Sequence, residues 1–278
     1  MVAVEFNPQS GTILSMTMKG ALKWTVFTGL FLIPFIPFLL SSSLFFPFIT
    51  TKAFVWRIVI EIIFASWLIL ALRFPEYRPK KSPLLWAFGA FVIVIILADL
   101  FGIDQMRSIW SNFERMEGLI SLLHLFAFFL VISSVFGETQ WNRWWNTTLL
   151  ASALMVVYSF FQVAGVIRVS QSDARVDGTL GNAIYLAVYL LFHIFIALLF
   201  MYREWRNKTL RWVYGILVLS QIFILYFTAT RGTILGLLGG LLIFALLNLR
   251  NRENSYVRKG SLALIIALVA SVSIFFAA

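Results

Sequence analysis

Arg175 and Arg231 are the residues of this sequence whose surroundings best suit chemistry. Each borders a long apolar run, in RVDGTLGNAIYLAVYLL (Arg175–Leu191) and TATRGTILGLLGGLL (Thr228–Leu242). A guanidinium presents several N–H donors in a planar fork, which matches a phosphate or another oxyanion. An arginine at a membrane boundary is costly unless its side chain reaches water or binds an anion. We therefore consider both arginines candidates for anion binding.

The residues after Arg175 predict a helix N-terminus beside it. Asp177-Gly178 is typical of a tight turn, and Gly181 permits a backbone corner. Asn182 suits the N-cap of the helix that follows, where its side chain accepts a first-turn amide. The start of that helix carries the positive end of the helix dipole and free N–H groups. Together with Arg175 it would form a cradle for an anion.

Each arginine also has a simpler explanation, which the residues leave open. For Arg175 it is an ion pair with Asp173 or Asp177. For Arg231 it is a side chain that extends to water. Arg231 lies in a short corner between two apolar runs and has no acid next to it in the sequence, which favours an anionic ligand. The glycines that follow it at every fourth position predict close packing of that helix against a neighbour; they are Gly232, Gly236 and Gly240.

The composition identifies the setting. Of 278 residues, 61% are hydrophobic and only 12% are charged, with a mean hydropathy of +0.91, far from the balance of a soluble domain. We therefore predict an integral membrane protein. With no cysteine and two histidines, both in apolar runs, we expect no thiol chemistry and no metal site.

The apolar stretches predict about nine transmembrane helices, because about 20 apolar residues cross the hydrocarbon layer as a helix. We expect an all-α polytopic bundle, with residues 1–278 as a single transmembrane domain. The expected spans are Gly20–Leu40, Phe54–Leu72, Leu84–Leu100, Leu119–Phe136, Thr147–Val166, Ala183–Met201, Trp212–Thr228, Thr233–Leu249 and Ser261–Phe276.

The basic residues predict the orientation. With a cytoplasmic N-terminus, most of the 22 Lys and Arg residues fall on the inner side, as the positive-inside rule requires. Basic inner loops are attracted to anionic lipid headgroups, which explains the net charge of +10. We therefore expect no nucleic-acid partner. On the outer side we expect an interfacial helix or loop over residues 101–118, a loop over residues 167–182 that carries Arg175, and the short corner that carries Arg231. The two arginines therefore share the outer face.

Ionisable residues also lie inside the expected spans. Glu61 and Arg57 are one turn apart, which predicts an (i, i+4) ion pair. His124 and His193 are each interpreted as a buried hydrogen-bonding residue rather than a proton carrier.

The two arginine motifs, and more weakly RSIWSNFERMEGLISLLHLFAFFLV (Arg107–Val131), resemble those of the O-antigen ligase family, which includes lipid-linked oligosaccharide polymerases. The resemblance implies a glycosyltransferase at the outer face of the bacterial inner membrane. Such an enzyme moves a glycan from undecaprenyl diphosphate to an acceptor hydroxyl on a lipid, protein or glycan, without a metal or other cofactor. It also implies that Arg175 and Arg231 hold the diphosphate, supported by Asp177, Gly178, Gly181 and Asn182.

The family's proposed base is a histidine in a large outer loop, and no histidine occurs in the expected outer loops here. We therefore leave the catalytic base unassigned and expect the chain to be the N-terminal part of a longer ligase or polymerase, ending after the ninth span. Two alternatives stay open: a transporter or flippase for a lipid-linked anion, and a non-catalytic membrane subunit. A transporter would be indicated by paired charges near the bilayer midplane.

Overall fold

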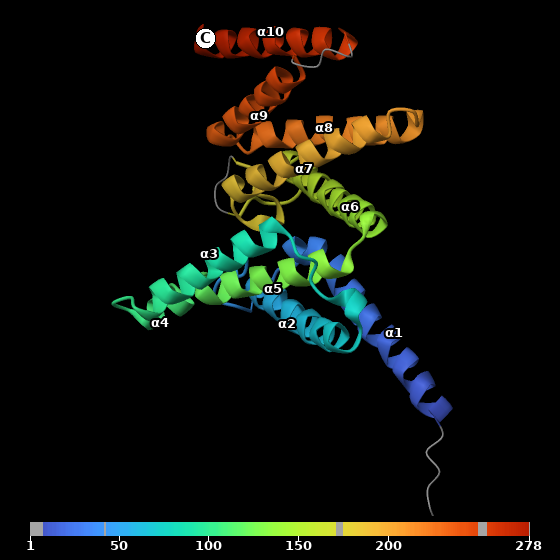
Figure 1. The fold of residues 1–278 in the computed structure, drawn as a ribbon. Coiled ribbons are helices and arrows are strands. Elements are labelled where there is room, and N and C mark those ends of the chain that lie inside the picture. Colours follow the sequence, from blue (N-terminus) through green and yellow to red (C-terminus); the bar gives the residue numbers. More distant parts are fainter. Residues whose placement is uncertain (1–7, 42, 171–174, 250–254, 278) are drawn as a thin grey trace, which may run out of the picture. The chain divides into compact units, whose positions relative to one another are not determined.

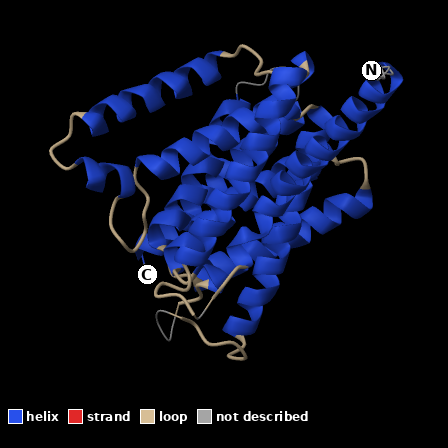
Figure 2. Ribbon diagram, turned by 90° about the horizontal axis from the view of Figure 1, so that it is seen from below, coloured by secondary structure: helices blue, strands red, loops and turns tan. Residues whose placement is uncertain are grey.

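The computed structural model describes residues 8–41, 43–170, 175–249 and 255–277, and the regular structure within them is helical throughout (Figure 1, Figure 2). The predicted all-α class is therefore confirmed. The α-helices are α1 (Pro8–Leu32), α2 (Thr50–Arg73), α3 (Pro83–Leu100), α4 (Gln105–Trp110), α5 (Leu119–Val135), α6 (Glu138–Val163), α7 (Ala183–Arg203), α8 (Lys208–Phe227), α9 (Arg231–Leu249) and α10 (Ser255–Ala277). Short 3₁₀ turns are η1 (Ile33–Phe38), η2 (Pro75–Tyr77) and η3 (Gly178–Leu180).

Seven helical segments in the described part of the chain are long and apolar enough to cross a membrane. They are Thr17–Phe38, α2, α3, α6, α7, α8 and α9. These segments indicate a multi-pass membrane protein, since a soluble fold would have to cover them. The remaining two expected spans coincide with α5, an apolar helix of 17 residues, and α10. The total of nine spans and the side of the N-terminus stay predictions.

Local sequence explains where several helices begin or change form. Pro34 and Pro37 convert the end of the first apolar run from α-helix to the η1 turn, because proline lacks an N–H and its ring collides with the preceding turn. Ser82 caps α3 by accepting the amide of Leu85 at 3.1 Å. Asn207 caps α8 in the same way. Such caps satisfy amides that have no partner within the helix.

Residues Met1–Ala151 and Ser152–Ala278 form two compact units. In the first unit, α2 contacts both α1 and α5, and α5 also contacts α3 (Figure 1). The side chains between α1, α2 and α5 form an apolar core that is closed at one end by aromatic rings of α6. Its buried members are Val26, Leu30, Ile60, Ile63, Trp67, Leu70, Ala71, Val131, Ile132 and Phe136.

In the second unit, α7 contacts α8 and α9, and α9 contacts α10. A Cβ atom at Gly240 would lie 2.5 Å from Cζ of Phe195, and one at Gly236 would lie 3.5 Å from Cδ2 of Leu191. Both partners belong to α7, so the glycine stripe of α9 faces α7 at these two positions, as its spacing predicts. A Cβ at Gly232 would meet nothing within 4 Å.

The segment 101–118 is helical only in part. A helix or loop was expected here. α4 ends at Trp110 because Ser111 adopts φ 63°, and Met116 adopts φ 52°. These backbone conformations are incompatible with a continuous helix. The segment is therefore one short helix followed by turns. Its place at the outer interface stays a prediction.

Candidate functional site

The corner between α8 and α9 is made of Thr228, Ala229 and Thr230. The amide of Thr228 bonds to the carbonyl of Ile224, and its hydroxyl donates to the carbonyl of Leu225 at 2.7 Å. Ala229 adopts φ 49°, which turns the chain so that α9 starts at once. The first residue of α9 is Arg231. The predicted short corner is thus confirmed, but Arg231 is the first residue of α9 and not the apex, and α8 and α9 do not pack side by side as a hairpin would.

Arg175 binds to this corner. Its Nε donates to the carbonyl of Thr228 at 2.8 Å, and its Nη2 donates to Oγ1 of Thr230 at 3.0 Å. The neighbouring amide of Val176 donates to the carbonyl of Phe227 at 3.2 Å. Thr230 immediately precedes Arg231 in the chain. The structure therefore brings Arg175, which is more than fifty residues earlier, to the residue beside Arg231.

The Arg175 segment is anchored by a buried carboxylate. Asp177 is 1% exposed. Its Oδ1 accepts Nε2 of Gln162 at 2.8 Å, and its Oδ2 accepts the amide of Ser170 at 2.8 Å. The side-chain oxygen of Gln162 in turn accepts the amide of Gly178 at 2.8 Å. These bonds connect the end of α6 to the segment that carries Arg175.

The simpler explanation of Arg175 fails for one of its two acids. Asp177 forms no ion pair with Arg175, because its two carboxylate oxygens are directed to Gln162 and Ser170. The second acid, Asp173, lies outside the described residues. Arg175 instead uses backbone and hydroxyl oxygens, which leave its positive charge without a described carboxylate partner.

The turn residues behave as their types predict. Gly178 and Gly181 adopt φ 59° and 67°, a region that glycine enters without strain. A Cβ at Gly178 would also lie 2.9 Å from the sulfur of Met155. Asn182 caps α7 by accepting the amide of Ile184 at 2.8 Å, so the predicted N-cap is confirmed. Their expected role in supporting a bound diphosphate stays a prediction.

Arg231 is exposed, and the structure gives its side chain no hydrogen bond or ion pair with a described residue. Arg175 is half-buried and retains the N–H groups of Nη1 for a further acceptor. Two guanidinium-bearing residues at one corner form an electropositive site suited to an oxyanion. We call the set of Arg175, Thr228, Thr230 and Arg231 the arginine corner.

Three contributors to this site were not anticipated from the sequence: Gln162, Thr228 and Thr230. Gln162 did carry a signal in the sequence, because it is an amide deep in a mostly apolar expected span. The structure buries it to 5% exposure. A buried amide needs partners, and it finds them in Asp177 and Gly178. The two threonines carried none, since their backbone and hydroxyl oxygens act only once the chain is folded.

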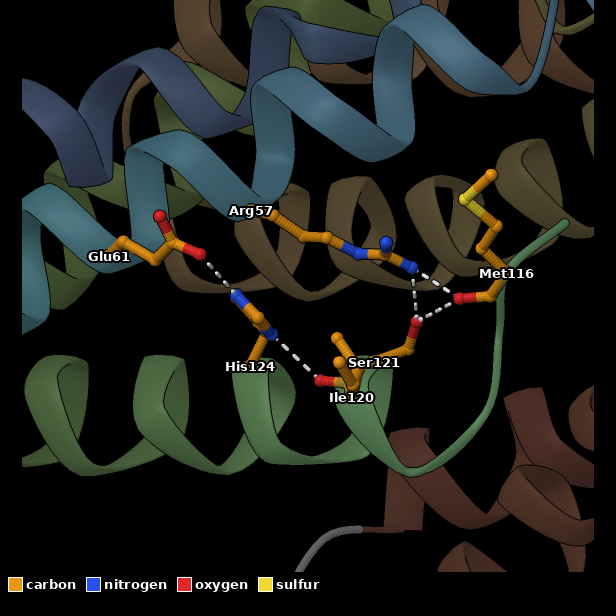
Figure 3. Close-up of polar contacts among 6 residues, drawn as sticks. All are labelled: Arg57, Glu61, Met116, Ile120, Ser121 and His124. Atoms are coloured by element: carbon orange, nitrogen blue, oxygen red, sulfur yellow. Dashed lines mark hydrogen bonds and ion pairs between the residues drawn. The ribbon is translucent and has the colours of Figure 1, made fainter. Parts of the chain in front are cut away.

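The polar residues of the first unit differ from prediction (Figure 3). Arg57 and Glu61 do not pair. Arg57 donates from Nη2 to the carbonyl of Met116 and to Oγ of Ser121, while Glu61 contacts Nε2 of His124 at 3.2 Å. The (i, i+4) prediction was wrong because the turn at Met116 leaves a carbonyl without a helical partner, and that carbonyl accepts the guanidinium.

Histidine, aspartate and glutamate side chains do not gather in groups of three or more that could hold a metal ion within the described ranges. Scans against protein-family models, curated proteins and solved structures found no match to the chain. What the fold defines is therefore a class, a multi-pass helical membrane protein, and the function has to be argued from its sites.

Proposed function

We propose that the chain is the donor-binding membrane part of a glycosyltransferase of the O-antigen ligase kind. It would bind a glycan carried on undecaprenyl diphosphate and present it to an acceptor hydroxyl at the outer face of a bacterial inner membrane. Arg175 and Arg231 would hold the diphosphate. The proposal assigns no catalytic base to the described residues.

One observation carries the proposal: Arg175 donates to Thr228 and Thr230, and Thr230 directly precedes Arg231. The two motifs that resemble the family are far apart in the sequence, yet their residues meet at one corner. Breaking a sugar–diphosphate bond leaves negative charge on the diphosphate. Fixed guanidinium groups near a membrane would stabilise that charge as it develops, without reorganisation during the reaction.

The proposal requires Arg175 and Arg231 to lie on the outer face. The expected topology places them there, with a cytoplasmic N-terminus, five spans before Arg175 and two more before Arg231. The distribution of basic residues supports it. The exposed side chain of Arg231 also agrees with it, since a ligand of this kind would approach from the membrane surface.

The test is binding of undecaprenyl diphosphate by the purified chain in lipid nanodiscs, compared with undecaprenol, which lacks phosphate. A hydrogen bond to a charged group contributes about 1.5–3 kcal/mol. Arg175→Ala and Arg231→Ala should therefore each weaken diphosphate binding about ten- to a hundredfold. Lysine at either position should restore little of it, because an ammonium cannot form the planar fork.

Arg168→Ala is the matched control. Arg168 is exposed and lies in the same outer segment as Arg175. The bond recorded for it, from Nε2 of Gln162 at 3.4 Å, goes to its backbone carbonyl and does not involve its side chain. This variant loses the same charge and should bind as the wild type does. Equal binding of diphosphate and undecaprenol, or equal weakening by all three alanine variants, would refute the proposal.

A transporter or flippase for a lipid-linked anion is the second candidate. The observation that favours it is the contact between Glu61 of α2 and His124 of α5, because paired ionisable side chains inside the membrane are typical of transport proteins. The two functions can be separated in a reconstituted system in which movement of the lipid-linked anion across the membrane is blocked. Glycan transfer that continues under this block would favour the enzyme.

A further inference from the structure

Glu61 lies at the middle of its helix. α2 runs from Thr50 to Arg73, and its 24 residues include Glu61 as the twelfth. At 1.5 Å per residue, each end of the helix is about 17 Å away. A carboxylate in the middle of a membrane-crossing helix is expensive unless it is neutralised, and it is seldom without a function.

The partner of Glu61 is His124 of α5, and the hydrogen bonds of the ring fix where its proton lies (Figure 3). Nδ1 is 2.7 Å from the carbonyl oxygen of Ile120. A carbonyl only accepts, so Nδ1 carries the hydrogen. Nε2 then faces Oε1 of Glu61 at 3.2 Å. Two acceptors do not attract one another, so this contact requires one further proton between them.

That proton lies either on the imidazole ring or on the carboxyl group. In the first case the pair is an imidazolium and a carboxylate, and in the second it is a neutral imidazole and a carboxylic acid. Both forms have zero net charge. Removal of the proton leaves one negative charge and two facing lone pairs. Two facing lone pairs repel, so the observed Nε2–Oε1 contact is the one made with the proton in place.

The surroundings of the pair are apolar. A groove of about 370 Å³ opens beside it between α2 and α5. Besides Glu61 and His124, its lining consists of apolar side chains, namely Ile60, Phe64, Leu123, Phe126, Ala127 and Leu130. The side chain of His124 is 15% exposed and that of Glu61 is 66% exposed. The groove therefore leaves the carboxyl group more open than the ring, which is largely covered.

Arg57 holds the same two helices together one turn away. Its guanidinium donates to Met116 and Ser121 at the start of α5 and does not pair with Glu61. The other charged side chains on the helical segments packed against α2 and α5 are Lys19 and Lys23 of α1, Lys52 and Arg73 of α2, Glu76 of η2, Asp99 of α3 and Arg107 of α4. None of them is recorded in an ion pair or hydrogen bond with Glu61 or His124 among the described residues.

We propose that Glu61 and His124 form a proton-binding site within the membrane part of the chain, which holds one proton between α2 and α5. The proton holds the Glu61–His124 contact together, whereas Arg57 and the apolar core keep α2 and α5 packed with or without it. Proton occupancy and the Glu61–His124 contact are therefore linked reciprocally. The site is in the first unit and does not depend on the proposed glycan transfer.

The sequence provides its own reference for a test, because it has only two histidines. His193 makes the same contact from Nδ1 to a carbonyl, that of Tyr189 at 2.7 Å, and has no recorded contact with a described carboxylate. The full chain, labelled with ¹⁵N-histidine, is placed in lipid nanodiscs. Nitrogen NMR then reports which ring nitrogens carry hydrogen, and infrared difference spectra report a protonated carboxyl group.

At a pH at which His193 carries one ring proton, the site should contain one proton more. It appears either as a protonated Nε2 of His124 or as a carboxylic-acid band that Glu61→Gln removes. A His124 ring with hydrogen on Nδ1 only, combined with an ionised Glu61, would overturn the inference. This comparison uses the wild-type chain, so it does not depend on the folding of a variant.

Glu61→Gln supplies a second readout. The glutamine amide donates to Nε2 directly, so the α2–α5 contact persists while the shared proton is lost. His124 should then match His193, with hydrogen on Nδ1 alone. Asp99→Asn, a neutralised acid on the neighbouring α3, should leave the His124 spectrum unchanged. A protonated Nε2 that survives in Glu61→Gln would show that Glu61 does not hold the proton.

Discussion

Asp177→Asn tests how the Arg175 segment is held in place. Asparagine has the same shape but replaces one carboxylate oxygen with an NH₂ group. That group must face either Nε2 of Gln162 or the amide of Ser170, both of which are donors. Rotation of the Gln162 amide gives no relief, because its oxygen is already bound to the amide of Gly178. One bond to a charged acceptor is lost in every arrangement.

The magnitude follows from that count. A bond to a charged group contributes about 1.5–3 kcal/mol, so Asp177→Asn should reduce the local stability of the segment by about 2 kcal/mol. Asp177→Ala removes the acceptor for both donors and should cost about twice as much. The order of stability is wild type, then Asp177→Asn, then Asp177→Ala.

Trypsin cleavage after Arg175 is the assay, because the protease must bind that side chain. Arg175 is available only after it leaves Thr228 and Thr230. When opening is faster than cleavage, the rate follows the population of the open form, and about 2 kcal/mol corresponds to about a thirtyfold increase. Asp99→Asn is the control and should cleave at the wild-type rate. If the Asp177→Asn chain is cleaved no faster than the wild type, the bonds of Asp177 do not hold the Arg175 segment in place.

Three further predictions concern single contacts. Thr230→Ala removes the acceptor for Nη2 of Arg175 and should weaken undecaprenyl diphosphate binding about three- to tenfold, whereas Thr230→Ser should bind normally in the same assay. Gly240→Ala places a Cβ atom 2.5 Å from Phe195 and should lower stability to denaturant by about 1–3 kcal/mol, whereas Gly239→Ala, with nothing within 4 Å of its Cβ, should be neutral or stabilising by up to about 1 kcal/mol. A hydrogen bond from Lys19 at 2.6 Å lowers the pKa of Glu76 from its ordinary 4.5. This pair therefore contributes stability above pH 4.5, and the contribution is lost as the pH falls through the lowered pKa. Glu76→Gln should abolish that part of the acid dependence in unfolding experiments between about pH 3 and 6, where carboxylates titrate.

Local features of the fold could be predicted from the sequence because they depend on neighbours in the chain. The apolar runs become helices at the expected places, since backbone groups in a membrane must be satisfied within the segment. Asn182 caps α7 because its side chain reaches an amide two residues away. Gly236 and Gly240 face α7 because their spacing places them on one side of α9.

Contacts between distant residues could not be predicted in the same way. Arg57 was expected to pair with Glu61, yet it binds Met116, whose carbonyl becomes available only through a turn with φ 52°. Because Arg57 binds elsewhere, Glu61 contacts His124 instead. Neither the helical spacing nor the residue types indicated this partner. Gln162 was detectable as a buried amide in an apolar run, but its partners Asp177 and Gly178 required the folded segment.

The central claim is that Arg175 and Arg231 bind one diphosphate together, and a double-mutant cycle tests it most directly. Affinities for undecaprenyl diphosphate are measured for the wild type, for Arg175→Ala, for Arg231→Ala and for the double variant. If both guanidinium groups grip the same anion, the double variant should lose clearly less affinity than the product of the two single losses, with a coupling of at least about 0.5 kcal/mol. Independent, multiplicative losses would show that the two arginines serve separate sites.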